Sequence, residues 1–463
     1  MDKKYICKLS KKGGREISVS KKLFSRKELL KLIFPLMVEL ALTLLVGMID
    51  SVMVSSVGEA AVSGVSLIDT VFQLLIYIFA AFGTGGAVVA GQYLGAGKKE
   101  EARATSGQLV WFSGLVSVGI MGFIYLMRKF LLTIVFGAIT PEVYECADRY
   151  LLVVALSIPA LSVYESGVAI FRTMGNSRIT MYLSAMMNLI NICGNAIFIY
   201  FLKFGTAGAA AATVISRYVA AVVIIGLLLQ KKRALYLEKT LHYKPDGRQI
   251  KKILSIGVPN GIENGLFQAG KIILASLVAG FGTSAITANA ICQTVASIQV
   301  IPGSAMQLAA TTVIARCIGA RDEIQAQYYN RVLLILSYVA LFIFCVSLWF
   351  ALPVILKWYH LSHATAGLTS QMVFVHTAGA VLIWSLTFVL PASMRAAGDV
   401  RFAMIISVVS MWIFRIGVAY LFAGTFGFGA LGVWLAMVCD WLFRAVVFSI
   451  RWLSGKWKAY RVV

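Results

Sequence analysis

The stretch PLMVELALTLLVGMIDSVMVSSVG, residues 35–58, is mostly apolar and returns in altered form 224 positions later, at residues 259–282. The leading proline, the glutamate four residues after it and the closing glycine coincide in the two stretches. The register holds without a gap over residues 35–102 and 259–326. A later segment, RTMGNSRITM from Arg172, matches RAAGDVRFAM from Arg395 at an offset of 223. Because prolines, glycines and arginines rarely coincide by chance at constant spacing, we infer that the chain contains two copies of one unit.

The composition places both copies in a membrane. The chain has 463 residues, of which 59% are hydrophobic and 13% are charged, whereas about a quarter of the residues of a soluble protein are charged. About 20 apolar residues cross the hydrocarbon core as a helix, and the apolar runs do not alternate with polar residues as barrel strands do. We therefore predict an all-α integral membrane protein with twelve transmembrane helices in two parallel six-helix repeats, an N-lobe and a C-lobe, around a central cavity. The predicted spans are residues 30–54, 62–90, 105–127, 147–171, 180–202, 206–230, 253–280, 284–315, 331–351, 369–394, 402–424 and 428–450.

Lysines and arginines gather in alternate connections between these spans. The N-terminal tail, the segment 231–252 and the C-terminal segment are basic, whereas opposite connections such as SSVGEA carry almost no basic residue. The positive-inside bias then predicts a multi-pass protein of the cell membrane with both termini cytoplasmic. It also accounts for the net charge of +22, so we expect no nucleic-acid partner. No cleavage site follows the first apolar run, so we expect that run to be retained as a span.

The repeat also predicts the domain organisation. Residues 1–230 form the N-terminal tail and the N-lobe, residues 231–252 form a cytoplasmic linker, and residues 253–463 form the C-lobe and the C-terminal tail. Each copy holds an even number of spans, so both enter the membrane in the same direction. Parallel repeats of this kind build transporters whose substrate path lies between the repeats.

No catalytic motif stands out in the chain. The seven cysteines are scattered and lack the close pairs of a zinc site, so we interpret them as packing residues. The cytoplasmic connections contain no Walker-type glycine loop, zinc-protease motif or nucleophile elbow. We expect neither an enzyme nor a bound cofactor, and we expect the chain to act as a monomer.

Four motifs in order make the chain resemble the multidrug and toxic compound extrusion (MATE) family. They are P-x14-D-S-V-M-V-x3-G from Pro35, GQYLGAGKKEEA from Gly91, the paired RTMGNSR and MRAAGDVR segments, and NLINICGN from Asn188. The resemblance implies a two-lobed secondary antiporter that exports organic, usually cationic, compounds in exchange for Na⁺ or H⁺. Its partners would be a small organic molecule and the lipid bilayer.

The resemblance also implies an ion site in the N-lobe. Asp50 matches the family's first-helix aspartate, which binds a proton or a cation such as Na⁺, and Asn191 and Asn195 match the fifth-helix pair that faces it. One family branch has an aspartate where this chain has Asn195, so a site built from two acids is not expected here. In another branch two C-lobe positions are acidic, but here they are Phe267 and Trp384, so we expect that branch's C-lobe cation site to be absent.

Other polar residues inside the predicted spans are candidates for the substrate cavity, because an acid at the centre of a membrane helix costs about 2.5–3.5 kcal/mol on insertion scales. Glu39 and Glu263 each follow a proline, and either line the cavity or hold the kinked helices. Lys271 and Arg415 either pair with Glu263 or Asp440 or meet an anionic substrate. The full set of cavity candidates is Glu39, Glu263, Lys271, Arg415, Gln268, Gln293, Trp384 and Tyr77.

Two other functions are compatible with a duplicated membrane chain. A flippase of lipid-linked precursors would line its cavity with several arginines and open sideways to lipid. A channel or a membrane-embedded enzyme would show a continuous pore or converging catalytic groups. The leading hypothesis is ion-driven export of an organic compound by rocking of two lobes, which opens a central cavity to alternate sides.

Overall fold

The computed structural model describes residues 22–137, 139–238, 244–460 and 462–463, and within these ranges it contains helices and no strand. This confirms the predicted all-α class. The first half contains α1 (Arg26–Ser55), α2 (Glu59–Gly95), α3 (Lys99–Leu126), α4 (Arg128–Phe130), η1 (Leu131–Val135), α5 (Pro141–Val154), η2 (Ala155–Ser157), α6 (Ile158–Thr173), α7 (Ser177–Asn195), η3 (Ala196–Phe201) and α8 (Gly205–Leu228). The second half contains α9 (Gly247–Ala279), α10 (Thr283–Gln299), α11 (Ile301–Gly319), α12 (Glu323–Trp358), α13 (His363–Leu382), α14 (Trp384–Ala397), α15 (Val400–Ser410), η4 (Met411–Gly417), α16 (Val418–Tyr420), η5 (Leu421–Thr425), α17 (Gly429–Leu453) and η6 (Lys456–Ala459).

The number of spans can be compared with the predicted twelve. Among the described residues, nine helical segments are long and apolar enough to cross a membrane, or up to eleven if two bent helix pairs each count as one span. The bent pairs are α10 with α11 and α13 with α14, each bent by 48°. Helix α9 has 33 residues, about 50 Å at 1.5 Å per residue, but its polar residues keep it out of that count. Among the described residues, length and composition therefore support nine to eleven spans, and α9 lies outside that count.

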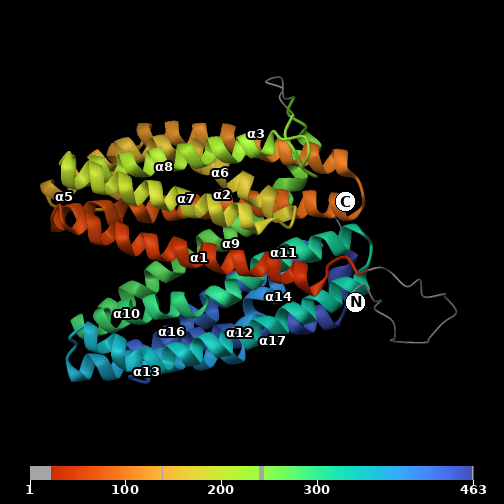
Figure 1. The fold of residues 1–463 in the computed structure, drawn as a ribbon. Coiled ribbons are helices and arrows are strands. Elements are labelled where there is room, and N and C mark those ends of the chain that lie inside the picture. The colour runs from red at the N-terminus through yellow and green to blue at the C-terminus, as the bar shows by residue number, and fades with distance from the viewer. Residues whose placement is uncertain (1–21, 138, 239–243, 461) are drawn as a thin grey trace.

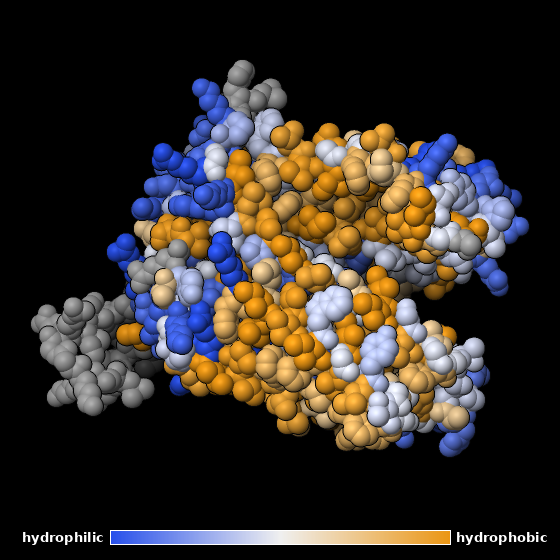
Figure 2. Space-filling model, turned by 180° about the vertical axis from the view of Figure 1, so that it is seen from behind, coloured by the Kyte–Doolittle hydropathy of each residue, from blue (hydrophilic) through white to orange (hydrophobic). Residues whose placement is uncertain are grey.

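The helices form two lobes that diverge like the arms of a V (Figure 1). Helices α1–α8 make the N-lobe and α9–α17 make the C-lobe. The lobes meet at the end that carries both termini, which we call the closed end, and separate at the other, which we call the open end. Figure 2 shows a hollow between the lobes at the open end and a broad apolar band between two polar ends. This surface fits a molecule embedded across a lipid bilayer.

Glycines allow the lobes to meet closely at the closed end, where α2 packs against α9 and α11. A Cβ atom added to Gly319 would overlap the carbonyl oxygen of Gln92, and one added to Gly95 would overlap that of Arg316. Gly95 and Gly319 are equivalent positions of the internal repeat. The same glycine from each copy therefore packs on the backbone of the other lobe, as small residues do between membrane helices.

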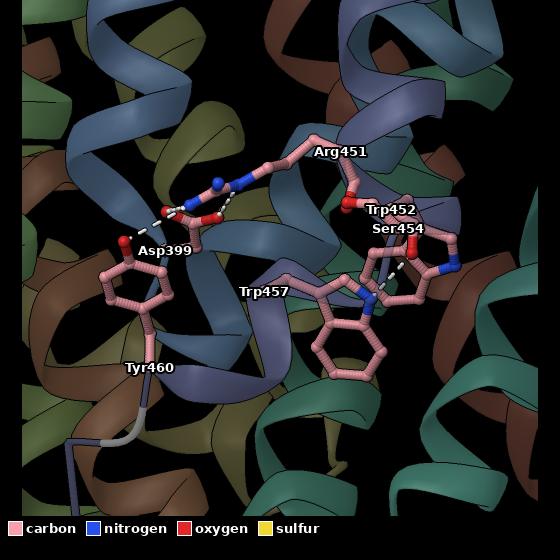
Figure 3. Close-up of polar contacts among 6 residues, drawn as sticks. All are labelled: Asp399, Arg451, Trp452, Ser454, Trp457 and Tyr460. Carbon is pink, nitrogen blue, oxygen red and sulfur yellow. Dashed lines mark hydrogen bonds and ion pairs between the residues drawn. The ribbon is translucent and has the colours of Figure 1, made fainter.

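The C-terminal segment folds back beneath α17 (Figure 3). Arg451 forms a bidentate ion pair with Asp399, at 2.8 and 3.3 Å, and also donates to the hydroxyl of Tyr460 at 3.2 Å. The fully buried Trp457 stacks on Trp452 with ring centres 4.2 Å apart. These contacts fix the direction in which the chain leaves the C-lobe.

Each end of the chain then contacts the lobe formed by the other half. The backbone nitrogen of Val462 donates to the side-chain oxygen of Gln92 in α2 at 3.3 Å. Before α1, the backbone nitrogen and oxygen of Phe24 both bond to the Tyr329 hydroxyl in α12, at 3.0 and 2.6 Å. The closed end is therefore tied by exchanged terminal segments as well as by glycine packing.

A π-helix marks the main local difference between the two copies. The glycines that open α8 and α17, Gly205 and Gly429, stand 224 residues apart, whereas Arg172 and Arg395 stand 223 apart. The extra C-lobe residue coincides with η4, a π-helix whose N-lobe counterpart lies inside the regular α7. The second C-lobe π-helix, η5, corresponds to η3 in the N-lobe. Because a π-turn holds one residue more than an α-turn, η4 accommodates the insertion, and it carries Arg415. Such turns are frequent at functional sites.

Candidate functional site

A cavity of about 280 Å³ lies within the N-lobe, lined by side chains of α1, α2, α5, α7 and α8. Its acidic residues are Asp50 from α1 and Asp69 from α2. Both lie in the half of the lobe near the open end, because Asp50 stands five residues before the end of α1 and Asp69 ten residues after the start of α2.

Asp50 sits against two asparagines of α7. The amide nitrogen of Asn195 donates to Asp50 Oδ1 at 2.8 Å. With its amide turned to satisfy its neighbours, Asn191 donates to Asp50 Oδ1 and Oδ2 at 2.7 and 3.1 Å, and its oxygen accepts from the Thr213 hydroxyl at 3.2 Å. Asn191 and Asn195 are one helical turn apart and therefore share a face of α7. The structure thus brings together the three residues that the resemblance assigned to the ion site.

A second carboxylate enters the same cavity from α2. The Tyr150 hydroxyl donates to Asp69 Oδ1 at 3.2 Å, and Arg217, which donates to the Ser157 hydroxyl at 2.7 Å, also lines the cavity. The sequence comparison considered a second acid only at the fifth-helix position, where this chain has Asn195, whereas the second acid of the cavity comes from α2. Asp69 lies inside the predicted span 62–90, so the rule that intramembrane acids are functional candidates could have found it.

This group of oxygens has room for a small hard cation. The side-chain oxygen of Asn195 is buried and has no hydrogen-bond partner, although buried polar atoms are nearly always paired. Carboxylate, amide and hydroxyl oxygens are the ligands that hard cations take. A proton on the half-buried Asp50 would also neutralise its charge, which partial isolation from water makes costly.

The two proline-associated glutamates lie elsewhere, in matching ion pairs. Arg172 donates to Glu39 at 2.7 Å, and the Thr180 hydroxyl bonds the other oxygen of Glu39 at 2.7 Å. In the C-lobe, Arg395 contacts both oxygens of Glu263 at 3.2 and 3.1 Å. Both glutamates are buried, and neither is among the residues that line the N-lobe cavity or a second cavity, in the C-lobe, that is described below. Arg172 and Arg395 are the residues that open the repeated R-x2-G segments. Because both glutamates are buried in matching ion pairs, the geometry favours the alternative in which they hold the kinked helices rather than bind substrate.

A second, smaller cavity lies within the C-lobe. Three of the predicted cavity residues, Lys271, Gln293 and Arg415, line it together with Asn289 and Trp434. Arg415 forms an ion pair with Asp440 at 3.6 Å, which is one of the two pairings expected for it.

The remaining candidates lie outside both cavities. Gln268 on α9 and Tyr77 on α2 are half-buried. Trp384 is 4% exposed, stacks on Phe388 at 4.7 Å and fills the space above Gly303. Its side chain therefore packs in the C-lobe interior and lines neither of the two cavities, and a role for it in the substrate path stays a prediction.

Comparison with known proteins agrees with this geometry. The MatE family model matches residues 35–197 and again residues 259–421, so the two matches begin 224 positions apart and confirm the internal repeat. The "Uncharacterized transporter YisQ" of Bacillus subtilis is 27% identical over 448 residues, which cover 93% of this chain and 94% of that protein. The "Probable multidrug resistance protein NorM" of Thermotoga maritima is 27% identical over 454 residues, covering 95% and 94%.

The fold also matches a solved structure described as the outward-facing conformation of a multidrug resistance MATE family transporter of the MOP superfamily. The TM-score is 0.86 at 21% sequence identity, and the match covers 94% of this chain and 96% of that one. A transporter of this family has no catalytic reaction of its own, in agreement with the missing enzyme motifs. Because the family model matches more than half of the chain, in both repeats, this protein belongs to the MATE family of multi-pass membrane transporters.

Proposed function

We propose that the chain is a secondary active antiporter that exports small organic compounds, cationic ones among them, in exchange for Na⁺ or H⁺. The observation that carries the proposal is the Asp50 cluster, where a carboxylate, two amides and a hydroxyl converge in a cavity beside a second acid. The coupling ion neutralises Asp50 when bound. Only the N-lobe carries this cluster, because position 50 corresponds to Leu274 in the C-lobe.

Ion binding at this cluster links three helices of the N-lobe. Asp50 belongs to α1, while Asn191 and Asn195 belong to α7 and Thr213 belongs to α8. An ion that these groups share therefore stabilises one packing of α1 against α7 and α8, and its release favours another. The hollow at the open end and the glycine contacts at the closed end support such alternation between two arrangements.

We take the orientation from the positive-inside bias of the sequence, which places both termini in the cytoplasm. With the closed end, which carries both termini, in the cytoplasm of the cell, the open end faces outside, the arrangement from which an exported compound leaves. One chain contains both lobes, so a monomer suffices for transport. The family match and the multidrug-resistance relatives do not favour the flippase alternative.

The test measures gradient-driven efflux of ethidium, an organic cation, from sealed vesicles that contain the purified protein. We expect wild-type efflux to respond to an imposed Na⁺ or proton gradient, and Asp50→Asn to lower the ion-driven rate by about tenfold or more. Glu59→Gln, which removes an exposed acid at the start of α2, serves as the matched control and should leave the rate unchanged. Ion-driven efflux that survives in Asp50→Asn at the wild-type rate would show that coupling occurs elsewhere.

A further inference from the structure

The C-lobe cavity is the internal-repeat counterpart of the N-lobe cavity. Outside the π-helix η4, where the register of the repeat shifts, eight of its nine lining residues correspond, at the offset of 224, to residues that line the N-lobe cavity. The corresponding pairs are Gly47 and Lys271, Asp50 and Leu274, Ser51 and Ala275, Val54 and Val278, Val65 and Asn289, Asp69 and Gln293, Ala209 and Val433, and Thr213 and Met437. Duplication therefore produced two related cavities, one in each lobe.

The charges of the two cavities are opposite. Both acids of the N-lobe cavity are replaced by uncharged residues in the C-lobe, whereas Lys271 stands where the N-lobe has a glycine. Arg415 joins Lys271 from the π-helix η4. The Lys271 Nζ atom and the Arg415 guanidinium each lie 5.3 Å from the centre of the Phe267 ring. Two cations on one ring repel each other, and an anion between them would relieve that repulsion.

Protein groups neutralise these cations incompletely. Among the described residues, Lys271 forms no ion pair or hydrogen bond, although it lines the cavity. Arg415 has Asp440 at 3.6 Å, but its Nε atom is buried without a hydrogen-bond partner, and its side chain is 9% exposed. Arg415 is buried, and buried cations are normally paired and fully hydrogen-bonded, whereas Lys271 is exposed. A buried, incompletely bonded guanidinium with an accessible lysine beside it fits a site that receives an anion from outside the chain.

A neutral donor completes the site. The Trp434 indole nitrogen donates to Asn289 Oδ1 at 3.1 Å, which occupies the amide oxygen and leaves the amide nitrogen of Asn289 as a donor at the cavity wall. The cavity encloses about 40 Å³, whereas a single water needs about 10–15 Å³ by a comparable measure. A carboxylate group therefore fits, and the body of a larger molecule would remain in the hollow between the lobes.

We propose that the C-lobe cavity is a binding subsite for the carboxylate of the exported compound, held by Lys271, Arg415 and Asn289. Among the exported compounds, those that carry a carboxylate then bind more tightly than organic cations that lack one. This inference rests on the proposed export function. It assigns selection of the substrate to the C-lobe and binding of the coupling ion to the N-lobe.

Equilibrium binding of two fluorescent dyes tests the subsite. A rhodamine with a free carboxylate and its methyl ester share one cationic ring system, and their binding to purified full-length protein in maltoside micelles is followed by fluorescence anisotropy. We expect the acid to bind about tenfold more tightly than the ester, the effect of one charge-assisted hydrogen bond. Lys271→Gln should remove this preference by weakening the acid alone, Lys271→Arg should retain it, and the exposed control Lys357→Gln should change neither dye.

Three outcomes would overturn the subsite. They are failure of the acid to bind, equal binding of acid and ester to the wild type, and an unchanged preference in Lys271→Gln. A lipid phosphate would meet the same cations, so the titration is repeated in nanodiscs that contain anionic lipid. If the rhodamine acid binds with the same affinity in nanodiscs as in micelles, the result supports a substrate carboxylate. Loss of acid binding in the nanodiscs would assign the cavity to lipid headgroups instead. Because no gradient is applied, these results are independent of the ethidium experiment, whose failure would overturn the antiport proposal alone.

Discussion

At the scale of single residues, the same ion pair recurs in both lobes and joins the first helix of each repeat to the arginine at the end of its fourth span. Glu39 contacts Arg172 and Glu263 contacts Arg395, and all four residues lie in segments that the two copies share. Removing one partner of a buried pair leaves an uncompensated charge, whereas removing both partners does not. This asymmetry distinguishes a structural pair from a substrate-binding acid.

We expect Glu39→Gln to lower the free energy of unfolding by about 3 kcal/mol, since breaking a buried pair costs about 3–5 kcal/mol. The double variant Glu39→Gln/Arg172→Gln should recover most of that loss. Denaturant titration in mild detergent, followed by tryptophan fluorescence, measures both, and Glu142→Gln at an exposed position is the control. Unchanged stability together with weaker dye binding would instead assign Glu39 to the substrate cavity.

At the scale of helices, the hydropathy pattern predicted where spans occur but not how they break. Residues 284–315 and 369–394 were predicted as single spans, yet each is bent by 48°. One break precedes Pro302, which lacks the amide hydrogen that a continuous helix needs. The other break, at Ile383, has no proline or glycine in the adjoining positions, so local sequence gives no signal for it. The π-helix η4 was visible only as a slip of the repeat register, which does not tell which turn accommodates the extra residue.

Helix η4 gives a prediction at this scale. Deleting Ile413, whose side chain is 57% exposed, should return η4 to an α-helix. An α-helix turns about 100° per residue, so Arg415 would rotate away from Asp440 and from the C-lobe cavity. We expect the preference for the rhodamine acid over its ester to fall to the level of Lys271→Gln, with ester binding unchanged. Ile413→Ala keeps the chain length and should retain the preference; a deletion variant that also retains it would show that η4 does not position Arg415.

At the scale of the whole molecule, the repeat predicted two lobes but not the opposite charges of their cavities. The alignment placed Asp50 opposite Leu274, and this indicated that the acid belongs to one lobe only. Lys271 and Arg415 are far apart in sequence, and Asp69 comes from a different helix than Asp50. Their convergence depends on helix packing, which hydropathy and spacing do not encode. The contact between Gly95 and Gly319 across the lobes was likewise visible only as a matched pair of glycines.

The contact between Gly319 and the backbone of Gln92 gives the last prediction. The two backbones need to come this close only while the lobes are packed together at the closed end. A side chain at position 319 would overlap the backbone of Gln92, so Gly319→Val should disfavour the present arrangement and shift the population toward one that is closed at the open end. Val57 and Phe281 occupy equivalent turns at the open end and are 39% and 38% exposed. Bioorthogonal spin labels at these two positions should therefore report a shorter mean distance in Gly319→Val than in the wild type. The control Gly119→Val, where an added Cβ meets nothing within 4 Å, should leave the distance unchanged. An unchanged distance in Gly319→Val would show that closed-end packing does not set the equilibrium between the two arrangements.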